Sequence, residues 1–438
     1  MKIVSHLLLL FLIAGSLCAQ DRAPGDTLSP IVSLHLQATV INQGRPGIVS
    51  PYSGPNSLRA SGEDQTSFTG TFYLSSRLWS GSALVVDPEV SGGKGLSSTL
   101  GLAGFPNGDI YRVASPDPHL YLGRCFVEQT FPLGDSTQAV PDAANQPGGS
   151  QPVRRLVLRA GKLSLTDYFD NNADSHDPRK QFLNWALMIG GAWDYAADTR
   201  GYTWGVACEL FDDAWIFHAA VCAVPYEANE LQLDTRIADA HSLNLELEHR
   251  HTWNGEPGGL HLLVYENVAR MGNYVLATTD TVYHRDIALT RAYGRTKTGF
   301  VVNLEQQIDN DMGVFARASW NDGKNETWAF TEIDGSLSAG ANVSGTRWGR
   351  PDDNAGLACI VNTISQNHRD YLAAGGEGFM IGDGKLTYGP ESIVEAFYSY
   401  QLVAAVAISA DYQFILNPAY NRDRGPVHIG GVRLHFEM

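Results

Sequence analysis

The stretch LVAAVAISADYQFIL, residues 402–416, and the closing VRLHFEM, residues 432–438, decide the fold. Apolar side chains recur in them at every second position: Leu402, Ala404, Val406, Ile408, Ala410, Tyr412, Phe414 and Leu416, then Val432, Leu434 and Phe436. Between them stand Ser409, Asp411, Gln413, Arg433, His435 and Glu437. A period of two places successive side chains on opposite faces of a strand. The pattern predicts amphipathic β-strands at the end of the chain.

The same period recurs along the chain, in the runs 33–40, 68–79, 243–248 and 300–305. Each run has about the length of one bilayer crossing by a tilted strand. Segments rich in Gly, Pro, Asn and Asp separate the runs and predict turns and long loops: residues 90–117, 134–152, 170–180, 254–259, 345–354 and 375–389. We count roughly sixteen strand candidates, with similar character on both sides of every loop. One domain over residues 20–438 is therefore expected.

The N-terminus has the pattern of a secretory signal peptide. Lys2 precedes an apolar run from Leu7 to Ala14, and small residues lead to Ala19. We expect cleavage after Ala19, so that residues 1–19 are removed, with cleavage after Cys18 as the second choice. A membrane anchor is the alternative, but the run is shorter than the ~20 apolar residues that a spanning helix needs.

Composition narrows the class of the exported protein. Charged residues make up 18% of the chain, aromatic residues 10%, and there are 45 glycines. Beyond residue 20 no stretch of 18 apolar residues occurs, which leaves a soluble β protein or a membrane β-barrel. A net charge of −16 argues against nucleic acid as a partner.

Aromatic residues cluster near predicted strand ends, where a barrel carries its interfacial girdles. They are Trp185, Trp193, Tyr195, Tyr202 and Trp204, then Tyr398, Tyr400 and Tyr412. The alternative is that they are ordinary core residues. The cysteines beyond the signal peptide, Cys125, Cys208, Cys222 and Cys359, have no metal-binding spacing. They are expected to be small buried residues, although export permits disulfides.

Several long stretches resemble one known family. GKLSLTDYFDNNADSHDPRKQF, residues 161–182, and WALMIGGAWDYAADTRGYTWG, residues 185–205, are similar to the central block of the carbohydrate-selective (OprB-like) porins. Further similar blocks are FARASWNDGKNETWAFTEID, residues 315–334, GTRWGRPDDNAGLA, residues 345–358, and residues 51–58, 101–126, 367–384 and 411–426. The resemblance runs in order over nearly the whole mature chain.

This resemblance implies an all-β fold, a sixteen-stranded transmembrane antiparallel barrel with long extracellular loops. It implies an outer-membrane location in a Gram-negative-type bacterium, contact with outer-membrane lipid, and a monomer or homotrimer. The implied function is passive diffusion of glucose-like mono- and oligosaccharides into the periplasm. The alternative is a structural or glycan-binding β protein of the outer membrane or of the medium that conducts no solute.

A sugar crossing a pore needs many weak contacts and no deep trap. Polar groups on lumen-facing strand positions supply such contacts, and charged groups strengthen them. The alternation assigns Arg155, Arg159, Asn303, Glu305, Arg317, Glu391 and Glu395 to the lumen.

Loops that fold into the barrel are candidates for a constriction. In WGRPDD, Trp348 would stack on a sugar while Arg350, Asp352 and Asp353 hydrogen-bond to it, and Asp177 and Arg179 in SHDPR would act likewise. The competing interpretation is that these residues hold the loops in place by internal salt bridges.

Other chemistry is weakly supported. Asp352 and Asp353 are adjacent and point apart on an extended chain, unlike the facing carboxylates of a glycosidase, and no GxSxG or HExxH motif occurs. We expect no enzyme activity, no cofactor and no metal site. His249 and His251, or the Asp-rich segments 170–174 and 309–311, match no defined metal motif, although a loop could hold calcium.

Overall fold

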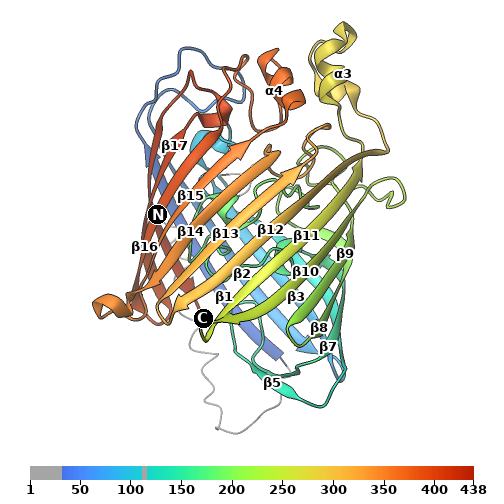
Figure 1. Ribbon diagram of the computed structural model, residues 1–438, viewed down its shortest axis with the longest axis vertical. Helices are drawn as coiled ribbons and strands as arrows, with labels where there is room; N and C mark the ends of the chain where they lie inside the picture. Colours follow the sequence, from blue (N-terminus) through green and yellow to red (C-terminus); the bar gives the residue numbers. More distant parts are fainter. Residues whose placement is uncertain (1–31, 111–115) are drawn as a thin grey trace.

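The computed structural model describes residues 32–110 and 116–438. The predicted signal peptide lies outside these residues. Within them, sixteen antiparallel strands close into one barrel (Figure 1), which confirms the predicted fold class. β18 pairs with β1, from Gln37 opposite Glu437 to Gly44 opposite Gly430. This closure leaves the barrel without a free edge.

The strands follow one another around the barrel in chain order, except that β4 pairs with β7. Their bounds are β1 (Val32–Arg45), β2 (Glu63–Arg77), β3 (Ser82–Gly93), β4 (His119–Pro132), β7 (Arg155–Leu163), β8 (Thr203–Asp212), β9 (Trp215–Cys222), β10 (His241–Trp253), β11 (Glu256–Ala269), β12 (Arg295–Asp309), β13 (Met312–Asn321), β14 (Gly335–Ser344), β15 (Asn354–Thr363), β16 (Glu391–Val403), β17 (Val406–Leu416) and β18 (Val427–Glu437).

The stretch that opened the sequence analysis divides between β16 and β17, because a turn at Ala404 and Ala405 interrupts it. On β17 the polar face, Ser409, Asp411 and Gln413, is buried inside the barrel. The apolar face, which includes Ile408 and Tyr412, is exposed on the outside. A barrel in lipid needs this inverted arrangement, since its outer face meets hydrocarbon and its interior is polar.

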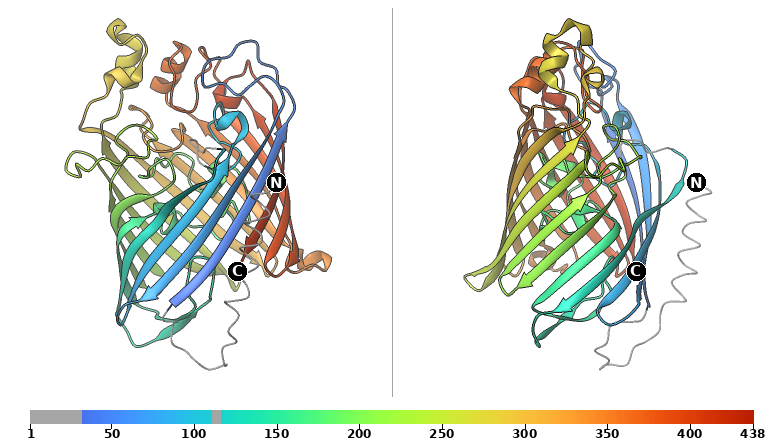
Figure 2. Two further views of the ribbon diagram at one scale, coloured as in Figure 1. Left: turned by 180° about the vertical axis from the view of Figure 1, so that it is seen from behind. Right: turned by 90° about the vertical axis from the view of Figure 1, so that its right-hand side faces the viewer.

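The two ends of the barrel differ. Short turns close one end, as at 213–214, 254–255, 310–311 and 404–405. Residue 254 therefore begins a two-residue turn, and the predicted loop 254–259 is mostly strand. The other end carries longer connections, among them α3 (Tyr274–Thr279) and α4 (Gln366–Ala373), which lie together beyond the barrel (Figures 1 and 2). At the short-turn end, a hairpin of β5 (Thr137–Val140) and β6 (Gly149–Pro152) extends between β4 and β7.

One long connection turns back into the barrel. Residues 164–202, between β7 and β8, carry α2 (Trp185–Met188), which begins where the Asn184 side chain accepts a hydrogen bond from the Ala186 N–H. We call residues 164–202 the inward segment. Residues 101–110, between β3 and β4, also enter, and the Pro106 carbonyl accepts hydrogen bonds of 2.8 Å from Gln43 and Gln413.

The inward segment corrects one prediction. Trp185, Trp193, Tyr195 and Tyr202 are buried inside the barrel and do not form a girdle. The Tyr195 ring stacks on Phe330, with centroids 4.7 Å apart, and Phe330 stacks on Trp185 at 5.0 Å. Trp204, by contrast, is exposed on β8, as are Tyr400 and Tyr412 on β16 and β17. The clustered aromatics thus belong to two different structures, an internal core and the outer surface.

Among the described residues, no helix has the length and apolar character needed to cross a membrane. The four cysteines beyond the predicted signal peptide are free thiols, and Cys359 is exposed. In the same part of the chain, no three His, Cys, Asp or Glu side chains form a group that could hold a metal ion.

Candidate functional site: the lumen cavity

A cavity of ≈ 2110 Å³ lies inside the barrel. Its walls are inner faces of strands, its lining includes residues 171–174 of the inward segment, and the β5–β6 hairpin lines it at the short-turn end. Closed ligand pockets usually measure about 300–1,000 Å³. A space this large suits a passage better than a binding pocket.

Aromatic side chains from several elements line the cavity. We call Tyr73 on β2, Phe126 on β4 and Tyr168 of the inward segment the aromatic region; Phe131 and Phe211 line the cavity as well. Flat aromatic faces cover the apolar face of a pyranose ring, as they cover other amphipathic ligands. This region supplies weak, non-directional contacts.

Another part of the cavity wall carries a row of charged and imidazole side chains. Glu209, His218, Glu248 and His261 stand on β8, β9, β10 and β11, where strand register brings Glu209 opposite His218 and Glu248 opposite His261. His218 Nδ1 lies 3.3 Å from Glu209 Oε1, and His218 Nε2 lies 3.5 Å from Glu248 Oε2. We call these four residues the His–Glu row. Such groups exchange hydrogen bonds with sugar hydroxyls.

Arg159 joins the two regions. It stands on β7 and its Nε donates a 2.7 Å hydrogen bond to Glu128 on β4. Its Nη1 contacts Glu209 of the His–Glu row, and its guanidinium lies over the Tyr168 ring, 4.2 Å from the centroid. A charged donor held on an aromatic face by two carboxylates is fixed in place yet borders the cavity.

Sequence reasoning missed Arg124, a further cavity-lining arginine. Its Nη1 lies 2.6 Å from Asp87 Oδ2, and Nε and Nη2 each donate a 2.7 Å hydrogen bond to Asp167 of the inward segment. Register pairs Asp87 of β3 with Arg124 of β4. The signal available in the sequence was the pair of acids Asp87 and Glu89, two positions apart on one face of β3, which need a cationic partner such as Arg124.

The structure places all seven predicted lumen residues on the inner side of the barrel, but only Arg155, Arg159 and Glu305 line the cavity. Arg155 is already engaged: its Nη1 donates to the Pro152 and Val153 carbonyls, and its guanidinium lies 3.4 Å from the Phe211 ring centroid. Glu305 accepts a 2.5 Å hydrogen bond from the Ala173 N–H. Arg155 and Glu305 therefore line the cavity and also bind backbone groups of neighbouring loops.

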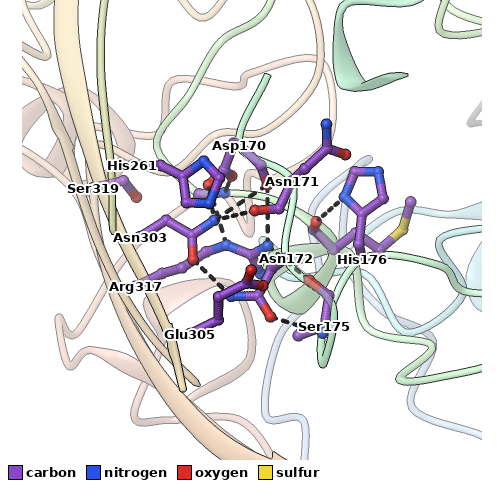
Figure 3. Close-up of polar contacts among 12 residues, drawn as sticks. Asp170, Asn171, Asn172, Ser175, His176, His261, Asn303, Glu305, Arg317 and Ser319 are labelled. Atoms are coloured by element: carbon purple, nitrogen blue, oxygen red, sulfur yellow. Dashed lines mark hydrogen bonds and ion pairs between the residues drawn. The ribbon is translucent and has the colours of Figure 1, made fainter. Parts of the chain in front are cut away.

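Asn303 and Arg317 anchor the inward segment to the wall (Figure 3). Asn303 donates to Asp170 and accepts from Asn172 at 2.8 and 2.7 Å. The Arg317 guanidinium donates to the Ser175 and Leu187 carbonyls, both at 2.7 Å. Because these donors are saturated by protein acceptors, the residues are buried supports of the segment.

Glu391 and Glu395 on β16 hold both inward loops through backbone N–H groups. Glu391 accepts hydrogen bonds of 3.0 and 2.7 Å from Ala103 and Gly104. Glu395 accepts from Leu183 at 2.5 Å and from Asn184 at 3.0 Å. A carboxylate that accepts two backbone N–H groups satisfies donors that would otherwise be buried without partners.

Asp177 and Arg179 likewise act within the fold. Asp177 Oδ1 accepts a 2.8 Å bond from the Arg179 N–H. The Arg179 side chain donates to Asp109, of the other inward loop, and to Thr71, each at 2.8 Å. Neither residue is among those that line the cavity in the described part. The salt-bridge interpretation describes Arg179, which pairs with Asp109, whereas Asp177 holds the loop through a backbone hydrogen bond.

WGRPDD does not fold into the barrel, so the prediction of a constriction loop here is wrong. Residues 345–353 form the connection from β14 to β15. The Trp348 indole N–H lies 3.2 Å from the Tyr398 hydroxyl, and Trp348 is exposed. The Arg350 guanidinium covers the Tyr400 ring at 3.9 Å, and Tyr400 faces outward. These contacts with Tyr398 and Tyr400 of β16 hold the connection at the rim of the barrel.

The two adjacent acids of this turn differ in their partners. Asp353 accepts a 2.5 Å hydrogen bond from Arg350, which lowers the pKa of Asp353 to about 2. Asp352 is exposed and lines a small pocket of ≈ 340 Å³ together with Asp174 and Asp311. Neither acid borders the main cavity.

Two titratable groups of the inward segment lie at the cavity. Burial, with a contribution from the charge of Glu305, raises the pKa of Asp174 to about 6. Burial and the neighbouring Arg317 lower the pKa of His176, which contacts the Met188 carbonyl at 3.1 Å. At neutral pH the segment therefore presents a carboxylate and an uncharged imidazole.

A family model described as "Carbohydrate-selective porin, OprB family" matches residues 58–438. The chain belongs to the OprB family of carbohydrate-selective porins. It is similar to the high-pH structure of Pseudomonas putida OprB, with a TM-score of 0.70 and 14% identity over 93% of this chain and 94% of that one. The low-pH structure of the same protein has a TM-score of 0.51 and 11% identity, covering 93% and 92%.

Other solved channels share the fold. The outer-membrane channel DcaP of Acinetobacter baumannii has a TM-score of 0.50 and 9% identity, over 96% of this chain and all (100%) of that one. No curated protein sequence matches the chain. As an OprB-family porin, the protein is a sugar channel of the Gram-negative outer membrane. In such barrels the long loops are extracellular and the short turns periplasmic, so α3 and α4 lie outside the cell.

Proposed function

We propose that small neutral sugars cross this OprB-family porin through the ≈ 2110 Å³ cavity, between its aromatic region and the His–Glu row. The observation that carries the proposal is Arg159, held at once on Tyr168 and against Glu128 and Glu209 at the cavity wall. A pyranose meets stacking surfaces and charged hydrogen-bonding groups there, and both kinds of contact can be exchanged during passage.

The sugar leaves chemically unchanged in this proposal, and the concentration gradient alone drives transport. The carboxylates of Glu128 and Glu209 beside the route are tied to Arg159 in ion pairs, which leaves neither of them free to act across a glycosidic bond. We expect glucose and maltose to be recovered intact on the far side of the membrane.

Reconstitution in a planar bilayer tests the route. The wild-type protein should give single-channel steps, and added glucose or maltose should reduce the current in a saturable way. Tyr168→Ala should weaken this block without abolishing conductance, because it removes the surface beneath Arg159. Tyr283→Ala, in the connection between β11 and β12, is the matched control.

If glucose and maltose block the current through Tyr168→Ala as strongly as the current through Tyr283→Ala, sugars take another route.

A further inference from the structure

The β5–β6 hairpin is not required to build the barrel wall. β4 and β7 pair directly with each other, from Cys125 opposite Lys162 to Pro132 opposite Arg155. The hairpin strands pair only with one another, from Thr137 opposite Pro152 to Val140 opposite Gly149. Residues 133–154 are thus an addition at the periplasmic end, longer than the two-residue turns beside it (Figure 1).

The hairpin forms one boundary of the cavity. Eleven of its residues between Thr137 and Pro152, among them Asn145 at the tip, line the cavity. A solute that leaves the cavity at the periplasmic end must therefore pass this hairpin.

The tip of the hairpin reaches β1, although β3 and β2 separate β4 from β1 in the barrel. The Gln37 Nε2 donates to Asn145 Oδ1 at 3.3 Å, and His35 Nε2 lies 3.5 Å from Asp142 Oδ1. Gln37 and His35 stand on the inner face of β1, two positions apart. The hairpin therefore spans part of the mouth.

These contacts are weak compared with those of the inward segment. Both are at least 3.3 Å long, and the Asp142 side chain is 64% exposed. Most hairpin residues are exposed, and those between 137 and 152 include no apolar side chain larger than Val140. An element with few buried apolar contacts opens at low cost in free energy.

We propose that the β5–β6 hairpin is a periplasmic flap, closed when its tip docks on Gln37 and His35 of β1 and open when the tip leaves them. The flap narrows the exit of the cavity, and its release lets sugar pass. This inference rests on the proposed sugar route through the cavity.

Tethering the tip tests the flap. The double variant Gln37→Cys with Asn145→Cys is folded, inserted into liposomes and treated with a bifunctional methanethiosulfonate linker that a reductant cleaves. Swelling driven by glucose and by maltotriose should slow several-fold after treatment and recover after reduction. Unchanged swelling of the tethered protein would overturn the flap.

Two controls separate tethering from other effects. A monofunctional methanethiosulfonate of similar size, attached to both cysteines, measures the effect of bulk; equal slowing by it would also overturn the flap. Wild-type protein treated with the linker measures reaction at Cys125, Cys208, Cys222 and Cys359. If sugars cause no swelling in any untethered protein, the proposed route fails instead of the flap.

A shortened hairpin gives a second test. Replacing residues 141–148 by two glycines removes the tip that docks on β1. The variant should swell liposomes faster than wild type, most of all with maltotriose, while heat-modifiable migration reports that the barrel is folded. A folded variant with wild-type or slower swelling would contradict the proposal.

Discussion

The Arg317 Nε lies 3.2 Å from the Asp170 Oδ1 inside the barrel, and both side chains are shielded from solvent. Arg317 stands on β13, whereas Asp170 belongs to the inward segment. The inner wall of a lipid-facing barrel is polar. Chain that folds into it is held by ion pairs and hydrogen bonds to the wall as well as by an internal apolar core, and this pair is one of the polar attachments.

Replacing Arg317→Met should destabilise the porin by about 3–5 kcal/mol, because Asp170 would keep a buried charge without its partner. The midpoint of urea unfolding, followed by heat-modifiable migration, measures the change. Arg347→Met is the matched control: Arg347 pairs with Asp309 at 2.6 Å, but both side chains are about half exposed. Its effect should be about 0–1 kcal/mol. Equal effects of the two variants would show that Arg317 is not an anchor.

Arg159→Gln should raise the concentration of maltose that half-blocks the current by about ten- to a hundredfold, since a charge-assisted hydrogen bond contributes about 1.5–3 kcal/mol. The reversal potential in a salt gradient should also shift toward stronger cation preference, because Glu128 and Glu209 lose their counter-charge. Arg154→Gln is the control, as Arg154 pairs with Asp212 in an exposed contact. Sugar block that stays at the wild-type level would remove Arg159 from the route.

Trp348→Ala should leave sugar block unchanged. The side chain is exposed at the β14–β15 connection and contacts Tyr398, away from the cavity lining. We expect a stability change within about 0.5 kcal/mol, as for other exposed substitutions. If glucose blocks the current of Trp348→Ala less strongly than that of wild type in the planar bilayer, the β14–β15 connection contributes to the sugar route.

Acid should stabilise the attachment of the inward segment through Asp174. Its pKa in the folded protein, about 6, lies above the ordinary 3.8, so the unfolded chain loses this proton first. The stabilising contribution is complete below about 3.8 and is lost as pH rises through about 6. Asp174→Asn should therefore be more stable than wild type at pH 7, by about 1–3 kcal/mol.

Urea unfolding at pH 4.5 and 7 measures this difference in wild type and in Asp174→Asn. Asp135→Asn, at an exposed position before β5, is the control. Parallel pH dependence in wild type and Asp174→Asn would exclude Asp174 as the titrating group. The charge of Glu305 contributes to the raised pKa of Asp174. Glu305→Gln should therefore bring this pKa closer to 3.8 and narrow the pH range over which the stabilising contribution of Asp174 is lost.

The sequence by itself determined the barrel. Alternation such as that of Ser409, Asp411 and Gln413 with their apolar neighbours places one face in lipid and one inside, and this requires only local geometry. The same rule put Arg159 and Arg317 on the inner side, and the long similar blocks pointed to the porin family. These features depend on residues close together in the chain.

The tertiary structure alone decided what the inner side chains do. Arg317 and Glu395 meet backbone of the inward segment more than 100 positions away in the chain, and no periodic pattern records such contacts. For the same reason the sequence could not tell that residues 164–202 enter the barrel, whereas WGRPDD stays outside it. Each segment joins two neighbouring strands that pair directly, β7 with β8 and β14 with β15. The inward segment is long and carries apolar side chains such as Phe169 and Trp193 that pack inside the barrel, whereas the shorter β14–β15 connection is held at the rim by the contact of Trp348 with Tyr398.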